Sequence, residues 1–211
     1  TGVQTCALPI FLALPNNPTG NVYSRDRVEA VIQNCNGIVV LDEAYSPFTD
    51  KHHMELACAH DNVLLMRTLS KMGLAGLRLG MLFGNPALLA ELDKVRLPYN
   101  VGVLAQASAE FALHHYDVFL LQANKIRAQR ENLLEALSRL GGLDPWPSEA
   151  NFLLVRCRDR SADEVFEGLR ERGILIKNLH GVHPRLDQCL RLTVGTPEQN
   201  EAMLAALQQL L

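Results

Sequence analysis

The chain has 211 residues, of which 48% are hydrophobic and 20% are charged, and its formal net charge is -3. This length and apolar content can bury a core in one large domain or in one and a half smaller ones. Basic residues are scattered rather than clustered, so nothing in the composition indicates a nucleic acid or an anionic membrane surface as a partner. No stretch of the sequence is long and apolar enough to span a bilayer.

The cysteines have no metal-ligand spacing and are odd in number, which predicts reduced thiols in a cytoplasmic protein without a metal site. They are Cys6, Cys35, Cys58, Cys157 and Cys189.

The first ten residues, TGVQTCALPI, fit neither a signal peptide nor a clear structural element. They resemble the translation of a sequencing adapter that is fused in frame to a truncated gene. We therefore expect residues 1–10 to be a non-native leader and the natural N-terminal part of the protein to be missing.

The first part of the chain alternates apolar runs with helical or turn segments. Ser24 is expected to cap a helix that runs to about Asn34, and Pro86 to begin a helix that ends before Pro98. An alternation of this kind favours an α/β fold with a mostly parallel sheet. The apolar runs predict strands at residues 10–14, 38–41, 62–68 and 78–84.

The second part has a different pattern. Residues 101–140 are helical with breaks near Tyr116, and residues 141–150 form a linker-like break. An α+β pattern follows, with a capped helix that ends at Gly173 and a final helix with Thr196 as its N-cap. Strands are predicted at residues 151–157, 174–179 and 189–195. We therefore expect a partial large domain at residues 11–140 and a small domain at residues 141–211.

Polar side chains follow three of the predicted strands. Asn17 comes after the first, Asp42 and Tyr45 after the second, and Lys71 after the third. Ligands of open α/β sheets lie outside the carboxyl ends of the parallel strands, so these side chains are expected to line one crevice. The link from Lys71 to Arg78 is too short for a crossover helix, so the next strand is expected to be antiparallel and to return Arg78 to the same edge.

A lysine and an aspartate in one such crevice suit pyridoxal 5′-phosphate. The Lys71 amine can form a Schiff base with the aldehyde, and Asp42 can keep the pyridine nitrogen protonated. A free lysine has a pKa near ~10.4, so desolvation in an apolar pocket or a nearby cation such as Arg78 would favour the neutral nucleophile.

The remaining polar residues of the crevice match the other groups of the coenzyme. Tyr45 and Asn17 can form hydrogen bonds with the phenolic oxygen of the ring. Arg78 offers a planar fork for the phosphate, and the hydroxyls of Thr68 and Ser70 can add to it.

Four motifs occur in order, NNPTG, LDEAY, TLSKMGLAGLRLG and CLRLTVGT. In this order they resemble the aminotransferases of PLP-dependent fold type I, most closely the histidinol-phosphate aminotransferase branch, over residues 11–211. The resemblance implies a homodimeric cytoplasmic transferase of amino-acid biosynthesis, here histidine biosynthesis, that takes a small-molecule amino donor and a keto acid.

The resemblance also implies roles for residues outside the cofactor set. Lys71 is then the Schiff-base lysine and the base that moves a proton between the substrate Cα and C4′ of the coenzyme. Arg191 matches the C-terminal arginine that binds the anionic group of the substrate. Lys177, on the preceding predicted strand, lies near the place of a second basic residue.

The sequence departs from this pattern in two respects. The spacing from Lys71 to Arg78 is one residue shorter than the common form. We also expect the N-terminal segment of the family to be missing. That segment supplies the aromatic that stacks on the coenzyme, a glycine-containing turn at the phosphate, and contacts to the neighbouring subunit.

Each assignment has a structural alternative. Asp42 can cap a helix that begins at Glu43, Tyr45 can simply pack near Pro47, and asparagine is common in turns such as the one at Asn17. Arg191 can be an edge-strand charge. Five of the seven histidines are expected to be solvated because they lack ligand spacing; these are His52, His53, His60, His114 and His115.

The function has alternatives as well. A threonine-phosphate decarboxylase-like enzyme or an aromatic amino acid aminotransferase fits the same motifs. A PLP-binding regulator module is a non-enzymatic alternative, and the chain as given can be an inert fragment of an enzyme.

Overall fold

The computed structural model describes residues 8–211, which form two compact units. Of these residues, the first unit contains 8–16 and 22–120, and the second contains 17–21 and 121–211. The predicted domain boundary at residue 140 and the predicted leader stay predictions, and residues 1–7 of that leader lie outside the described part.

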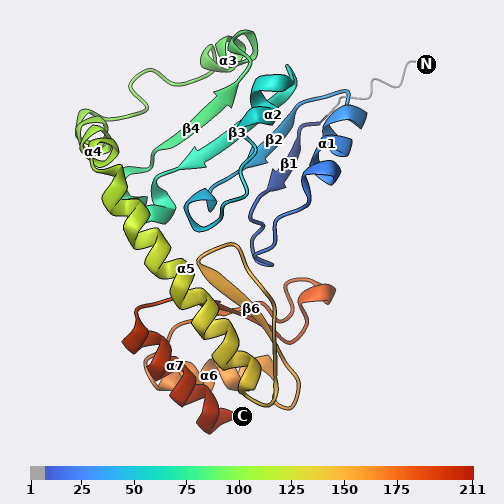
Figure 1. The fold of residues 1–211 in the computed structure, drawn as a ribbon, viewed down its shortest axis with the longest axis vertical. Coiled ribbons are helices and arrows are strands. Elements are labelled where there is room, and N and C mark those ends of the chain that lie inside the picture. Colours follow the sequence, from blue (N-terminus) through green and yellow to red (C-terminus); the bar gives the residue numbers. More distant parts are fainter. Residues whose placement is uncertain (1–7) are drawn as a thin grey trace. The chain divides into compact units, whose positions relative to one another are not determined.

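The first unit is built on a four-stranded sheet in the order β1-β2-β3-β4 (Figure 1). The first three strands are parallel and β4 runs antiparallel to β3, as the sequence predicted. The strands are β1 (Ile10–Ala13), β2 (Val39–Asp42), β3 (Val63–Thr68) and β4 (Gly80–Gly84). The helices are α1 (Arg25–Asn34), α2 (Met54–Ala59), α3 (Pro86–Asp93) and α4 (Val103–His114).

The central strands β2 and β3 are continuous apolar runs because both of their faces are covered. Val40 and Leu64, on one face, are 5% and 4% exposed. The other face carries Val39 and Leu41 of β2 and packs with α1 and α2 into one core. Helices α1 and α2 contribute Val28, Ile32, Leu56 and Ala57 to this core.

Helix α3 begins at Pro86 and ends at Asp93, before Pro98, as predicted. Two other local predictions in the first unit are corrected. Ser24 precedes α1 but its side chain makes no capping hydrogen bond. Strand β4 begins at Gly80 rather than at Arg78, because the chain first makes a 3₁₀ turn at Ala75–Leu77.

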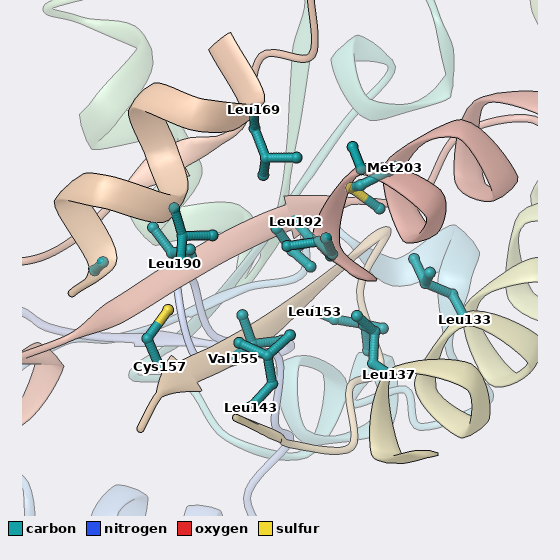
Figure 2. Close-up of a cluster of buried hydrophobic side chains, with 14 of the residues drawn as sticks. Leu133, Leu137, Leu143, Leu153, Val155, Cys157, Leu169, Leu190, Leu192 and Met203 are labelled. Atoms are coloured by element: carbon teal, nitrogen blue, oxygen red, sulfur yellow. The ribbon is translucent and has the colours of Figure 1, made fainter. Parts of the chain in front are cut away.

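The second unit contains most of the long helix α5 (Tyr116–Arg139) and an antiparallel sheet in the order β5-β6-β8-β7. Its strands are β5 (Leu143–Pro145), β6 (Phe152–Cys157), β7 (Lys177–Asn178) and β8 (Cys189–Thr193), and its other helices are α6 (Ala162–Glu171) and α7 (Pro197–Leu210). Figure 2 shows how leucines of β6 and β8 meet those of α5 and α6 in one apolar core.

The predicted N-cap of α7, Thr196, is confirmed, and α6 is capped as predicted, although its C-cap is Arg172 and Gly173 follows with a left-handed φ of 78°. Ser161 and Thr196 each form a capping box, with Glu164 and Gln199 as the reciprocal partners. Two strand predictions in this unit are inaccurate. The predicted linker contains the short strand β5, and the predicted strand at residues 174–179 is reduced to Lys177–Asn178.

The cysteines of the described residues are free thiols, as expected, whereas Cys6 lies outside the described part. Cys157 is buried on β6, and this burial, with a smaller contribution from Cys189, raises the pKa of its thiol to about 11. No helix within residues 8–211 combines the length and apolar character needed to cross a membrane.

The core of the second unit can be tested with Leu153→Ala. Leu153 is fully buried on β6, so truncation should lower the free energy of unfolding of this unit by ~2–5 kcal/mol. Urea unfolding followed through Trp146, the single tryptophan of the chain, reports on this unit. Leu175→Ala is the matched control, because Leu175 is 79% exposed and its truncation should change little. An equal decrease of the free energy of unfolding in the two variants would contradict the described core.

The thiols allow a second test. Iodoacetamide at about pH 8 should alkylate the exposed Cys58 in the folded chain and leave Cys157 unmodified, because only thiolates react readily. Peptide mapping by mass spectrometry distinguishes the two positions. Adding urea should bring the reaction of Cys157 up to that of Cys58; rapid alkylation of Cys157 without urea would show that β6 is not buried.

Candidate functional site

The strand ends of the first unit gather the predicted polar residues at one edge of the sheet. Asp42 is the last residue of β2, Thr68 is the last residue of β3, and Lys71 lies in the 3₁₀ turn that follows. The parallel register pairs Asp42 with Met66, so Asp42 and Thr68 lie on the same face. This is the edge at which open α/β sheets bind ligands.

The Asp42 carboxylate is half-buried, and its Oδ1 accepts a hydrogen bond from the Ala44 N–H at 3.0 Å. This bond holds the turn after β2, so the structural alternative for Asp42 is partly correct. Because only Oδ1 makes this bond, Oδ2 remains available as an acceptor for a ligand.

Lys71 and Tyr45 are brought together across the strand ends. The Lys71 Nζ lies 5.2 Å from the centroid of the Tyr45 ring, a cation–π distance. Tyr45 is 8% exposed, so packing and a site role are compatible for it.

The expected apolar surroundings of Lys71 are not found among the described residues. Lys71 is exposed, as are Gly73, Ala75 and Gly76 of the same segment. The reason is that the segment folds into two 3₁₀ turns of small side chains, which leave the lysine at the surface instead of covering it. The described segment therefore leaves Lys71 exposed and not enclosed.

Thr68 and Ser70 form a hydroxyl pair beside Lys71. Their side-chain oxygens lie 2.9 Å apart, and the Ser70 N–H donates to the Thr68 hydroxyl at 3.1 Å. Thr68 also donates to the Leu79 carbonyl at 3.0 Å, which ties the end of β3 to the residue that precedes β4. The pair therefore has a structural role and still presents hydroxyls next to Lys71.

Arg78 does not lie in a strand, contrary to the sequence prediction. It has a left-handed backbone with φ of 53° and ψ of 32° at the end of the Ala75–Leu77 turn, and its side chain is exposed. A left-handed backbone is unusual for a residue other than glycine and costs about 1–3 kcal/mol, and such strain clusters at ligand sites. The backbone geometry thus favours a specific role for this arginine, although the prediction that Arg78 begins a strand was wrong.

The second unit places two other predicted residues in direct contact. An Arg191 Nη1–H donates to Asn17 Oδ1 at 2.6 Å, and the guanidinium carbon lies 5.0 Å from the Phe152 ring. The Arg191 Nε is buried and has no hydrogen-bond partner within residues 8–211. A buried donor without a partner lowers the stability of the fold. The Nε–H of this arginine is therefore suited to donate to an acceptor atom of a ligand.

Lys177 lies directly opposite Arg191 in the antiparallel pair of β7 and β8. Residues paired in this way share a face of the sheet, and like charges at such positions are destabilising. An anion bound between the two would remove this repulsion. The register therefore supports the prediction that Lys177 accompanies Arg191, which the sequence suggested only through the resemblance.

The sequence prediction missed a buried ionic cluster at the same strand ends. Glu43 is completely buried, and its Oε2 accepts from Arg67 Nε at 3.0 Å and from Arg67 Nη2 at 2.7 Å. Its Oε1 accepts from the His53 backbone N–H at 2.6 Å and lies 3.1 Å from His53 Nδ1. His53, predicted to be solvated, is 3% exposed, because the loop after β2 folds it back onto this carboxylate.

The cluster keeps Glu43 ionised. Burial alone would raise the pKa of this carboxyl, but the hydrogen bonds from His53 and Arg67, with the charge of Arg67, lower it below its ordinary value of 4.5. The stabilisation that the carboxylate provides is therefore present above pH 4.5 and is lost as the pH falls through its lower folded-state pKa.

The donor set of the first unit fits pyridoxal phosphate. A primary amine beside an aromatic ring, a carboxylate with one oxygen free, paired hydroxyls and an exposed guanidinium match its aldehyde, pyridine nitrogen and phosphate. No cluster of three or more His, Cys, Asp or Glu side chains that could hold a metal ion occurs in the described part of the chain.

Several known proteins are similar to this chain in sequence. The histidinol-phosphate aminotransferase of Methylibium petroleiphilum is 53% identical over 204 residues, which cover 95% of this chain and 54% of that protein. The chain thus spans about half the length of the curated relatives it matches.

Two solved structures share the fold. Histidinol-phosphate aminotransferase from Sinorhizobium meliloti, in complex with pyridoxal-5′-phosphate, has a TM-score of 0.85 and 30% identity, over 96% of this chain and 57% of that one. L-threonine-O-3-phosphate decarboxylase from Porphyromonas gingivalis has a TM-score of 0.84 and 27% identity, over 95% of this chain and 63% of that one. The predicted type I fold of PLP-dependent transferases, with only part of the large domain present, is confirmed.

The family model of the class I and II aminotransferases matches residues 7–207, nearly the whole chain. The strand order, the lysine after β3 and this match lead to one conclusion: the chain belongs to the aminotransferase class I and II family.

Proposed function

We propose that this chain carries the lysine-bearing part of the active site of a PLP-dependent histidinol-phosphate aminotransferase. The enzyme would move the amino group of histidinol phosphate to 2-oxoglutarate and yield imidazole-acetol phosphate and glutamate. The observation that carries the proposal is the placement of the Lys71 amine over the Tyr45 ring, beside Asp42 at the next strand end. The 53% identity to a histidinol-phosphate aminotransferase supports the choice of substrate.

Pyridoxal phosphate, when bound, supplies an aldehyde that condenses with amines and a protonated pyridine ring that withdraws electrons from the substrate Cα. Lys71 would hold the coenzyme through its Nζ and later, as a free amine, would move the proton at the substrate Cα. The Tyr45 ring beneath this amine fixes its approach.

The other residues of the first unit would orient the coenzyme. Asp42 would keep the proton on the pyridine nitrogen through its free oxygen, because an anion in contact favours the charged form of that nitrogen. Tyr45 would donate to the phenolic oxygen. Ser70, Thr68 and Arg78 would bind the phosphate, Arg78 as a bidentate donor.

The resemblance assigns the remaining roles to residues of the second unit. Arg191 and Lys177 would bind the substrate anion, a phosphate for histidinol phosphate or a carboxylate for glutamate. Asn17, whose amide oxygen accepts from Arg191 in this structure, is assigned by the resemblance to the phenolic oxygen of the coenzyme. We further propose the homodimer and the cytoplasmic location implied by the resemblance.

The 211-residue chain itself is proposed to bind the coenzyme weakly, with Lys71 still its preferred lysine, and to show negligible transamination. It spans about half of its relatives, and Lys71 is exposed instead of enclosed. Strong cofactor colour and normal turnover in this chain would contradict this part of the proposal.

A phosphorylated amino acid decarboxylase is the second candidate, because the P. gingivalis decarboxylase shares the fold at 27% identity. The two reactions differ in their products. Glutamate formed from histidinol phosphate and 2-oxoglutarate supports the transaminase, whereas carbon dioxide released from threonine phosphate supports the decarboxylase.

The lysine can be identified by trapping. Incubation of the chain with limiting pyridoxal phosphate, followed by borohydride reduction and peptide mapping, should place the label on Lys71 in preference to Lys51, Lys94, Lys125 and Lys177. The reason is that only Lys71 has a carboxylate and paired hydroxyls placed for the rest of the coenzyme. Lys71→Ala should abolish the specific label. A label that falls equally on all lysines, or mainly on another one, would refute the proposal.

The substrate role of Arg191 can be separated from catalysis. In the complete gene product, Arg191→Lys should raise KM for histidinol phosphate roughly 10- to 100-fold, because a fork of two charged hydrogen bonds is replaced by a point charge. The value of kcat should fall less. Arg170→Lys, on the surface of α6, is the matched control and should leave both constants unchanged. A loss confined to kcat would assign Arg191 a different role.

A further inference from the structure

Two segments that carry the proposed coenzyme residues leave the sheet at neighbouring strands. One runs from Asp42 to Tyr45 after β2, and the other from Thr68 to Lys71 after β3. The backbone pairing between these strands stops at the hydrogen bond from Glu43 N–H to the Met66 carbonyl, at 2.9 Å. Beyond that bond, side-chain contacts must hold one segment against the other.

Glu43 and Arg67 provide such a contact on the far side of the sheet from the site. Side chains alternate along a strand, so Glu43 faces away from Asp42, and Arg67 faces away from Thr68. Both belong to the face whose apolar residues, Val39 and Leu41 on β2, pack on α1 and α2. The pair can therefore control the site only through the backbone, without touching a ligand.

Both oxygens of the Glu43 carboxylate are fully used. Oε2 accepts from Arg67 Nε and Nη2 and so joins the ends of β2 and β3. Oε1 is bonded to the backbone N–H and the Nδ1 of His53 and so closes the loop from Glu43 to His53. Tyr45 lies inside that loop. The carboxylate thus fixes Asp42 and Tyr45 on one side and Thr68 and Lys71 on the other.

A buried ion pair is weak support for stability as such, since well-packed apolar residues often serve as well. Its directional hydrogen bonds do fix geometry. The Arg67 side chain is still 28% exposed while the Glu43 side chain is 0% exposed, so the carboxylate is the fully enclosed centre of the cluster.

We propose that Glu43 is a positioning residue, which sets the placement of Lys71 relative to Asp42 and Tyr45 by joining the ends of β2 and β3 and closing the intervening loop. The inference rests on the proposed function, because it assigns Glu43 a task within the same coenzyme site. It predicts that loss of the carboxylate weakens the reaction of Lys71 with pyridoxal phosphate even in molecules that remain folded.

The test compares Glu43→Gln with the parent chain. The substitution keeps the shape of the side chain but turns an amide or an uncharged oxygen toward Arg67. The rate at which pyridoxal phosphate is trapped on Lys71 by borohydride should fall at least about 10-fold, since small misplacements of reacting groups have effects of this size. The label on Lys94 and Lys125 should not change. Glu55→Gln is the matched control, because it also removes a carboxylate paired with an arginine, Arg25, but at the surface.

Hydrogen exchange supplies a readout that needs no coenzyme. In Glu43→Gln, amides of residues 44–52 and 70–78 should exchange faster, while those of α1 and β1 stay as in the parent. If this variant fails to fold, Arg67→Lys serves instead, because it keeps the charge and removes only the fork. It should slow the trapping on Lys71 by a smaller factor.

The outcomes separate the two proposals. An unchanged rate of trapping on Lys71 in folded Glu43→Gln would overturn the positioning role and leave the proposed function standing. Where Glu43→Gln does not fold, the same result in Arg67→Lys has this meaning. Absence of preferential trapping on Lys71 in the parent chain would overturn both, and it would be seen before any variant is made. Slower trapping with unchanged exchange in α1 and β1 supports the inference.

Discussion

The parallel pairing of β2 with β3 is the constraint on which the rest of the candidate site depends. Its register, Asp42 opposite Met66, puts the carboxylate of one strand end and the lysine-bearing turn of the next at the same edge of the sheet. The apolar residues of both strands are buried on both faces, so a slip of one residue would expose the core and turn Asp42 to the wrong side. The hydrophobic pattern that stabilises the sheet therefore also fixes the geometry of the site.

Sequence patterns predicted the elements with strong local signals. The N-cap at Thr196 and the short link before β4 depend on local chemistry, and both predictions were correct. Ser24 has the right residue type for a cap, yet its side chain makes no capping bond. A residue type shows that a contact is possible, whereas its formation depends on backbone angles that the type does not determine.

The sequence motifs supplied the residues that we propose for the site, but the surroundings of these residues could not be predicted. Motif order identified Lys71, Asp42 and Arg78, while the burial of His53 depends on a loop that brings it back to Glu43 from ten residues away along the chain. No periodicity marks such a contact. The exposure of Lys71 and the left-handed backbone of Arg78 have the same origin, because both follow from how a segment of small residues turns after β3.

The two units show different ways of placing charge. In the first, the negative charge of Glu43 is enclosed and fully satisfied by Arg67 and His53, so it can stabilise geometry but cannot attract a ligand. In the second, Arg191 and Lys177 face each other with no carboxylate between them in their strand pairing, and Arg191 keeps a buried donor without a partner in the described part. The repulsion between the two cations and the unpartnered donor are unfavourable without an anion, and a bound anion would relieve both. The satisfied charge of Glu43 thus belongs to the framework of this protein, and the unsatisfied donor of Arg191 lies where we propose that a substrate anion binds.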